Sequence, residues 1–302
     1  MRVPPGDHGG DGARLARRLG VEPGAVLDLS ASLNPLAPDV TPLVASVAES
    51  VRRYPDPAPA VDALAAAIGV DPERVVLTNG GAEAISLVGA ACPTGRVDDP
   101  EFSLYARHLR HLSDDGPRWR SNPHNPTGVL AASRDRAAVW DEAFFPLATG
   151  CWTRGDADAI VVGSLTKIFA CPGLRAGYVL APDTKFAARL RELQPEWSVN
   201  SLACEVLPIL LGEADLPAWA VGIAALRSQL MQVLAAVGLH ADRSDANFVL
   251  VRDAAGVRDH LAGHGVLVRD TTSFGIPDGA RIAVPDARGL DRVACALEDW
   301  RC

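Results

Sequence analysis

The sequence predicts an α/β protein: a large domain built on a mostly parallel sheet, followed by a small α+β C-terminal domain. Residues 75–91 (VVLTNGGAEAISLVGAA) read as a strand, a glycine turn and a helix, the start of an α/β unit. Residues 158–167 (DAIVVGSLTK) read as a buried strand running into a loop, and residues after 183 give helices and then short strands. We expect an arm at 1–40, the large domain at 41–204 and the small domain at 205–302, joined by N-terminal segments.

The remaining elements follow from periodicity and from glycine and proline punctuation. Before the first α/β unit we expect helices at 11–20, at 41–57 (stopped by two prolines) and at 61–70, with an extended piece at 26–38. Residues 109–122 are polar and give no clear strand, whereas 137–145 form an extended run. The tail gives helices at 186–194, 201–211, 219–238 and 289–300, and strands at 246–252, 265–270 and 280–284.

The composition excludes several classes of protein. A net charge of −8 without a Lys/Arg-rich run argues against nucleic acid as a partner. No signal-peptide pattern and no uninterrupted apolar run of about 18 residues is visible, so we expect a cytoplasmic protein that does not span a membrane. Six scattered cysteines without a Cys/His cluster favour free thiols, with neither a disulfide framework nor a metal site.

The most informative segment is SLTKIFACPGLRAGY at 164–178. A lysine directly after a buried strand is costly to desolvate, so Lys167 can have a lowered pKa and attack an aldehyde. Ser164 and Thr166 offer hydroxyls and Arg175 offers a cation, which together suit a dianionic phosphate. The alternative is an ordinary surface lysine at the end of a strand.

This segment resembles the lysine signature of the fold-type I pyridoxal-phosphate enzymes in the class I/II aminotransferase group. The resemblance extends over nearly the whole chain and implies that Lys167 carries pyridoxal 5′-phosphate as a Schiff base. TNGGAEAI at 78–85 is similar to the turn that binds the cofactor phosphate, through Gly81, Ala82 and Glu83 at a helix start. NPHNPTG at 122–128 is similar to the loop whose asparagine, here Asn125, binds the ring oxygen O3′.

Further motifs of the family follow in the same order. By the resemblance Asp141, in WDEAF, pairs with the ring nitrogen and keeps it protonated, and Tyr105 stacks on the ring. Tyr54, in RRYPDP, would reach the phosphate in a neighbouring subunit, which implies a homodimer with shared active sites. Arg281, in RIAV, would bind the substrate carboxylate, and Arg269 is a second anion ligand. A half-buried tyrosine and solvated surface arginines are the alternatives.

Two subgroups share these motifs, the histidinol-phosphate aminotransferases and the threonine-phosphate decarboxylases. The opening HGG and the D-x-S-x-x-x-N-P-L segment at 28–36 resemble the decarboxylases and make His8 and Asn34 candidate substrate ligands. Phe144 favours the same subgroup, because the aminotransferases usually have tyrosine there. We therefore expect a decarboxylase for a phosphorylated amino acid such as O-phospho-L-threonine, in cobalamin biosynthesis. An aminotransferase of the histidinol-phosphate type and a pyridoxal-phosphate-binding protein with little catalysis stay open.

The chain departs from the family in length. It is shortened between Tyr105 and Asn122, and again between Gly128 and Asp141. The first gap is too short for the usual strand–helix–strand passage. We expect peripheral sheet elements to be missing and the cofactor edge to be more open.

Overall fold

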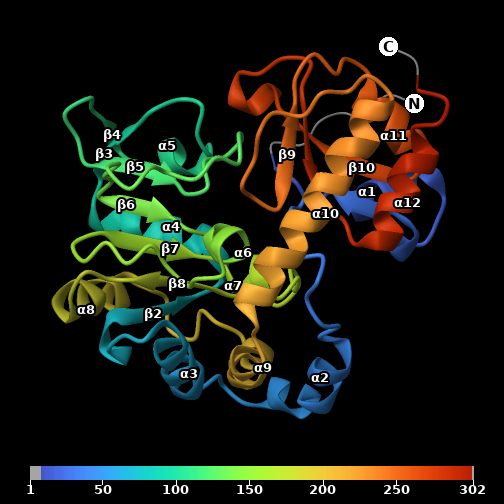
Figure 1. Cartoon of the computed structure of the whole chain (residues 1–302). Helices are drawn as coiled ribbons and strands as arrows, with labels where there is room; N and C mark the ends of the chain where they lie inside the picture. Colours follow the sequence, from blue (N-terminus) through green and yellow to red (C-terminus); the bar gives the residue numbers. More distant parts are fainter. Residues whose placement is uncertain (1–7, 301–302) are drawn as a thin grey trace.

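A computed structural model, which describes residues 8–300, shows two sheets flanked by helices (Figure 1). The larger sheet has seven strands in the order β2-β8-β7-β6-β5-β3-β4. It is mostly parallel, and β8 alone runs antiparallel to its two neighbours. This confirms the predicted α/β class. The strands are β2 (Val75–Thr78), β3 (Thr94–Val97), β4 (His111–Leu112), β5 (Arg118–Ser121), β6 (Val139–Asp141), β7 (Ile160–Gly163) and β8 (Gly177–Leu180).

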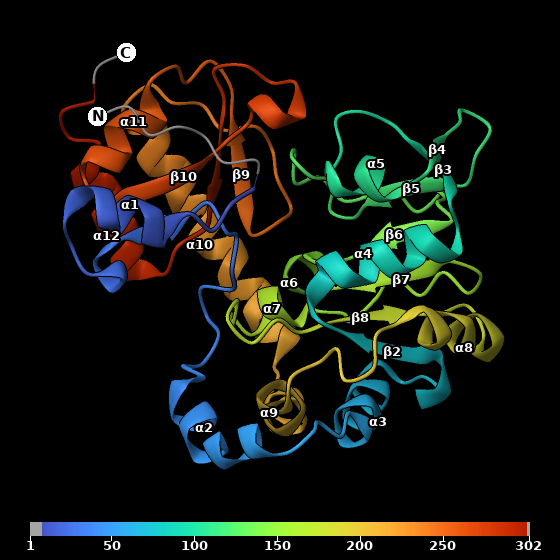
Figure 2. The same ribbon diagram turned by 180° about the vertical axis from the view of Figure 1, so that it is seen from behind.

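Helices cover both faces of this sheet (Figure 2). Along β7, Ile160 and Val162 pack with one set of helices and Val161 packs with the other, as strand pleating requires. Burial on both faces explains why β7 is apolar without alternation. The first set is α4 (Gly80–Ala91), α5 (Leu104–His108) and α8 (Thr184–Leu193). The second includes α3 (Ala58–Ile68), α7 (Leu165–Ile168) and α9 (Ser201–Gly212).

The shortened region keeps its strands and lacks helices instead. β4 and β5 lie in the segment where no clear strand is expected, so the prediction that peripheral sheet elements are missing is wrong. In β5 the sequence RWRS places Trp119 in the core, while Arg118 and Arg120 remain partly exposed on the opposite face. No helix occurs among the described residues 113–117 and 122–138, which join β4 to β5 and β5 to β6.

Arginine side chains cover the sheet face in this region. The guanidinium of Arg154 lies 4.8 Å from the ring centre of Trp140 on β6. It also pairs with Asp156 and donates hydrogen bonds to the carbonyl groups of Ala132, Ser133 and Asp135. The loop between β5 and β6 is thereby tied over a fully buried tryptophan without a helix.

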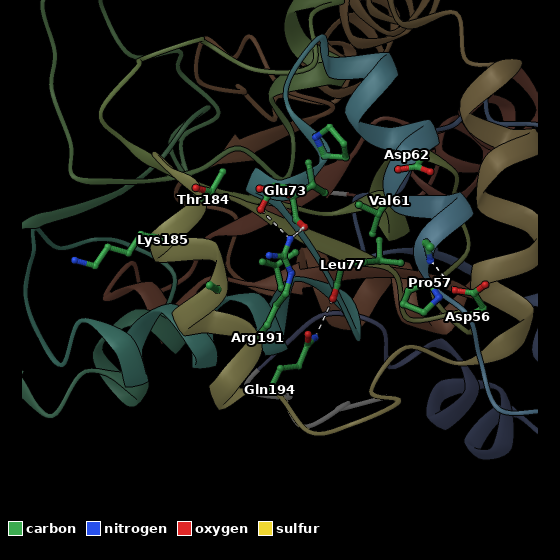
Figure 3. A pocket seen from close by; sticks show the side chains of 15 residues that line it. Asp56, Pro57, Val61, Asp62, Glu73, Leu77, Thr184, Lys185, Arg191 and Gln194 are labelled. Atoms are coloured by element: carbon green, nitrogen blue, oxygen red, sulfur yellow. Dashed lines mark hydrogen bonds between the residues drawn. The ribbon is translucent and has the colours of Figure 1, made fainter.

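The open edge of the large sheet is also capped by side chains. Arg191 of α8 donates to the carbonyl groups of Glu73 and Val75, and Gln194 donates to that of Leu77 (Figure 3). A wide groove of about 810 Å³ runs along this edge. The outward carbonyl groups of β2 are thus occupied within the chain itself.

The second sheet has the order β1-β10-β11-β9. β1 (Leu27–Leu29) pairs parallel with β10 (Val266–Asp270), so an N-terminal segment joins the C-terminal sheet. β11 (Ala280–Ala283) lies between β10 and β9 (Phe248–Val251). Around this sheet lie α1 (Gly12–Leu19), α10 (Leu216–Ala236), α11 (Val257–Gly263) and α12 (Ala287–Ala296). Residues 1–7 of the expected arm lie outside the described residues.

The expected domain boundary at residue 205 falls inside α9. The apolar side chains of α9 pack against α3 in the core of the large sheet, so α9 belongs to that unit. α10 then runs from α6 (Phe145–Thr149) to the second sheet, and we propose that the small domain begins within α10. Among the described residues, one helix, α10, is long and apolar enough to cross a membrane, judged by length and composition alone. Arg227, Ser228 and Gln229 interrupt its apolar sequence.

Candidate active site

A cavity of about 310 Å³ lies between the two sheets, at the carboxyl ends of β6 and β7. Ligand sites in open α/β folds are found at this end of the strands. Large-domain residues that line it include Ala82, Asn125, Asp141, Phe144, Lys167 and Arg175. The N-terminal arm contributes His8 and Ala31, and the C-terminal sheet contributes Arg269 and Arg281. The folded chain therefore brings segments from both ends of the sequence to one cavity.

Lys167 stands in the middle of this cavity. It follows β7 on the single turn of α7, and its Nζ donates a 2.6 Å hydrogen bond to the carbonyl oxygen of Ala31. Burial, followed by the charges of Arg281 and Arg175, lowers the pKa of Lys167 to about 8. A neutral amine is the reactive form toward an aldehyde, so this setting suits a nucleophile. The chain contains only one other lysine, Lys185.

The start of α4 provides a place for a phosphate. Gly81 and Ala82 line the cavity at the first turn of this twelve-residue helix, where backbone N–H groups are free. A Cβ at Gly80 would lie 2.6 Å from Nη2 of Arg175, so only glycine leaves room for that guanidinium. Ser164 and Thr166 lie on the same wall. Hydroxyls, N–H groups and one arginine fit a dianion.

Two of the predicted cofactor-binding residues, Thr166 of α7 and Glu83 of α4, use their side chains for hydrogen bonds within the protein. Thr166 exchanges hydrogen bonds with the backbone of Ala176, which fixes the loop after Lys167. Glu83 does not line the cavity: its carboxylate accepts the N–H of Asn79 at 2.6 Å and a hydrogen bond from Gln194. The expected role of Glu83 is thus limited to its backbone at the helix start.

Asp141 closes β6 and faces the cavity. Its Oδ1 accepts the N–H of Ala143 at 3.0 Å and its Oδ2 accepts the hydroxyl proton of Tyr105 at 2.7 Å. Burial raises the pKa of the Asp141 carboxyl, whereas the bond from Tyr105 opposes that rise. The two hydrogen bonds fix the orientation of the Asp141 carboxyl group, which faces the cavity.

The aromatic wall of the cavity is formed by a different residue from the one expected to stack on the ring. Tyr105 is 1% exposed and lies behind the cavity wall, whereas Phe102 lines the cavity. The Phe102 ring meets Tyr105 edge-on at 5.8 Å and His8 at 5.6 Å. Tyr105 therefore supports Asp141, and Phe102 is the ring available for stacking. The two aromatics stand three residues apart in one short segment, and the stacking role of Tyr105 stays a prediction that its placement behind the wall does not support.

The anion-binding arginines stand side by side. Arg269 and Arg281 are register partners across β10 and β11, and they are 4% and 6% exposed. Burial, followed by the charge of Arg269, lowers the pKa of Arg281 to about 9. Arg281 donates to the side-chain oxygen of Asn125 at 2.5 Å, and its Nε is buried without a hydrogen-bond partner among the described residues. Two buried neighbouring cations fit anionic ligands.

The N-terminal candidates differ in position. His8 lines the cavity. Asn34 does not line it: its amide donates to the carbonyl of Ile168 and its backbone N–H donates to that of Lys167, so it positions the lysine loop. The prediction of Asn34 as a substrate ligand is therefore not supported by its placement. Tyr54 is 77% exposed outside the cavity and packs on Trp197, with ring centres 4.5 Å apart.

Asp28 is a residue that the sequence reasoning missed. Its carboxylate accepts the N–H groups of Gly12 and Ser30 and the hydroxyl of Ser30, which in turn accepts the N–H of Gly10. A Cβ at Gly9 would overlap the carbonyl oxygen of Ser30. Asp28 and Ser30 thus hold the His8–Gly10 arm against the cavity. In the sequence, the D-x-S motif at 28–30 is the signal that could have identified these two residues.

This fold and site define a class of protein: a two-sheet α/β enzyme with a reactive lysine between a phosphate cradle and a pair of arginines. A model of the family "Aminotransferase class I and II" matches residues 119–297, and the chain belongs to this family. Its cofactor is pyridoxal 5′-phosphate, and the Lys167, α4 and arginine groups described above fit that molecule. The predicted family, cofactor and enzymatic nature are thereby confirmed.

Curated relatives include proteins of two different activities. The chain is 27% identical to histidinol-phosphate aminotransferase 1 of Dechloromonas aromatica (strain RCB), over 94% of the chain and 93% of the relative. It is also 27% identical to the threonine-phosphate decarboxylase of Salmonella typhimurium (strain LT2), over 97% and 96%. A solved histidinol-phosphate aminotransferase from Sinorhizobium meliloti, in complex with pyridoxal-5′-phosphate, superimposes with a TM-score of 0.79 at 19% identity, covering 98% and 94%.

Proposed function

We propose that this enzyme decarboxylates a phosphorylated amino acid, in the manner of a threonine-phosphate decarboxylase. The observation that carries the proposal is the excess of cationic side chains in one cavity. Arg175 suits the cofactor phosphate and Arg281 suits the substrate carboxylate. We assign Arg269, together with His8 on the N-terminal arm, to a second anionic group of the substrate. A side-chain phosphate provides such a group.

The proposed roles follow from the contacts. Pyridoxal phosphate supplies an aldehyde for amines and a ring that accepts electrons. Lys167 holds the cofactor and, once released, its neutral amine can move a proton at the substrate Cα. Asp141 holds the proton on the ring nitrogen, and Asn125 orients O3′. We further propose that Phe102 packs on the ring face and excludes water from it.

Phe144 supports decarboxylation over transamination. Its ring lies 6.0 Å from Nζ of Lys167 and packs edge-on against Phe248 at 5.1 Å. A tyrosine there would add a hydroxyl toward O3′, which phenylalanine does not. The ring instead gives the lysine an apolar neighbour. Whether CO2 or a proton leaves depends on how Arg269 and Arg281 turn the substrate carboxylate relative to the ring.

The second candidate is an aminotransferase of the histidinol-phosphate type, favoured by the relatives that carry this name. It too would use Arg269 and His8 for a phosphate. Membership in an enzyme family, together with a complete set of site residues, argues against a protein that binds the cofactor with little catalysis.

We also propose a homodimer with shared active sites. Tyr54 and Trp197 form an exposed aromatic pair, and Val51 is 63% exposed in the same region of the chain. In an assembled dimer Tyr54 would reach the cofactor phosphate of the partner subunit. Size measurement by light scattering, with Tyr54→Ala beside the wild type, tests this proposal. A wild-type monomer that binds cofactor fully would contradict it.

The reaction is tested by its products. The holoenzyme is supplied with O-phospho-L-threonine, and CO2 and a phosphorylated amino alcohol are measured; L-threonine is the matched control. Release of CO2 from the phosphorylated substrate alone supports the proposal. Formation of a keto acid from glutamate when the keto form of histidinol phosphate is supplied as the amino acceptor, and no CO2 from O-phospho-L-threonine, would replace it with the aminotransferase.

A further inference from the structure

Glu101 is a buried carboxyl group next to the cavity that none of the roles above uses. It is 5% exposed, and its two oxygens accept the N–H of Ser121 at 2.9 Å and the hydroxyl of Ser121 at 2.5 Å. Burial, together with the nearby charge of Asp141, raises the pKa of Glu101 to about 7, although the Ser121 bonds oppose the rise. This carboxyl group therefore changes its charge near neutral pH while it remains enclosed.

Ser121 connects Glu101 to the surroundings of two residues that line the cavity, Asn125 and Asp141. Its hydroxyl oxygen accepts the backbone N–H of Asn125 at 2.7 Å, which seats the loop that carries that amide. The same hydroxyl lies near the phenol of Tyr105, since Ser121 and Asp141 are register partners on β5 and β6 and Tyr105 donates to Asp141 at 2.7 Å. Four polar side chains, those of Glu101, Ser121, Tyr105 and Asp141, thus stand in a row with a hydrogen bond at each end.

We propose that Glu101 is a positioning residue that controls, through Ser121 and Tyr105, how strongly Asp141 is hydrogen-bonded and how Asn125 is seated. The inference rests on the role proposed for Asp141 at the ring nitrogen. Nothing in it depends on which substrate the enzyme takes.

The control follows from the single proton of a hydroxyl group. When Glu101 is ionised, Ser121 must give its proton to that carboxylate. When Glu101 is protonated, it can donate to Ser121, and Ser121 can then donate to the phenol oxygen of Tyr105. Donors aligned in this way polarise one another and strengthen the last bond, from Tyr105 to Asp141. One buried proton therefore alters the charge distribution beside the ring nitrogen.

The surroundings leave Glu101 as the group that titrates. On its own loop the backbone N–H of Phe102 favours the charged form, and Asp141 on β6 opposes it. Burial raises the pKa of Asp141, and the charge of Lys167, which lines the same cavity, opposes that rise. His124 bonds the carbonyl of Pro100 at 2.7 Å, and burial lowers its pKa, so it is neutral near pH 7.

The test is a pH titration of the holoenzyme with Glu101→Gln, which keeps the shape of the side chain and removes its charge. The visible absorption band of bound cofactor and the cofactor Kd are followed across neutral pH. We expect a step with a midpoint near pH 7 in the wild type and no step in Glu101→Gln. kcat should fall severalfold with KM little changed, because Glu101 touches no substrate.

Glu142→Gln is the matched control. Glu142 is 1% exposed and also has a pKa raised to about 7 by burial, but its oxygens accept the N–H of Arg154 and do not join the row. The Glu142→Gln variant should therefore keep the step near pH 7. Tyr105→Phe interrupts the row and leaves Glu101 in place, so this variant should lose the step. If Glu101→Gln does not fold, the titration of Tyr105→Phe tests the proposal in its place.

Two results would overturn the inference: a step that persists in Glu101→Gln or Tyr105→Phe, or a wild type without a step. Failure of the underlying site is separate. It would show as an Asp141→Asn variant whose absorption band and cofactor Kd equal those of the wild type.

Discussion

The pKa of Lys167 gives a quantitative prediction for cofactor capture. The burial and cation neighbours of Lys167 lower its pKa from 10.5 to about 8. At pH 7 roughly one molecule in ten then has a neutral amine, about 300-fold more than for an unperturbed lysine. Capture of pyridoxal phosphate by the apoenzyme should therefore quicken about tenfold per pH unit up to pH 8 and level off above it. Arg281 is the cation that lowers the pKa of Lys167 most, so Arg281→Gln should move the pH at which the capture rate levels off to a higher value.

Stopped-flow mixing of apoenzyme and cofactor, followed by the visible band, measures the profile. Because Lys185 is the only other lysine, borohydride reduction and peptide mapping show which amine reacted. Lys185→Ala should retain the whole profile, and Lys167→Ala should capture none. A rate that climbs without a break to pH 10, or a label on Lys185, would refute the reasoning.

The same pKa predicts that apoenzyme stability rises with pH. Between pH 8 and 10.5 the unfolded chain, in which the Lys167 pKa is 10.5, binds more protons than the folded chain. The free energy of unfolding therefore rises by up to about 3 kcal/mol across that window. Urea titrations with Lys167→Met as the reference check this. Arg154→Ala should lower the free energy of unfolding by about 3 kcal/mol, since it loses three carbonyl bonds and the Trp140 contact. Arg136→Ala, which loses two local carbonyl bonds at the surface, should cost far less in the same denaturant assay. Asp28→Asn should raise KM for a phosphorylated substrate about tenfold at similar kcat in steady-state assays, because the His8 arm loosens.

The sequence predicted those parts of the site that depend on local motifs. Lys167 and Asp141 end apolar strands, and parallel strands bring their carboxyl ends to one edge, so their meeting follows from the pattern. Phe102 and Tyr105 could not be told apart, because a short loop and helix decide which ring faces the cavity. Glu101 was invisible for a similar reason: a lone acidic residue between a proline and an aromatic gives no sign of burial.

The missed strand β5 has a physical cause as well. A central parallel strand normally reads as an apolar run, because helices bury both faces. Here the described segments on either side of β5, residues 113–117 and 122–138, contain no helix, and arginines alternate with Trp119, so the sequence resembles a loop. The shortening of the chain and the failure of the strand prediction thus have one origin.

The capped edge of β2 restricts how copies of this chain can associate. An uncovered edge strand invites another strand to add on, which leads to open-ended stacking of sheets. With Arg191 and Gln194 occupying its outward carbonyl groups, this edge offers an incoming backbone few acceptors. In the homodimer proposed above, assembly would use side-chain contacts such as the Tyr54 and Trp197 pair, and a two-fold interface there would close on itself and stop further growth.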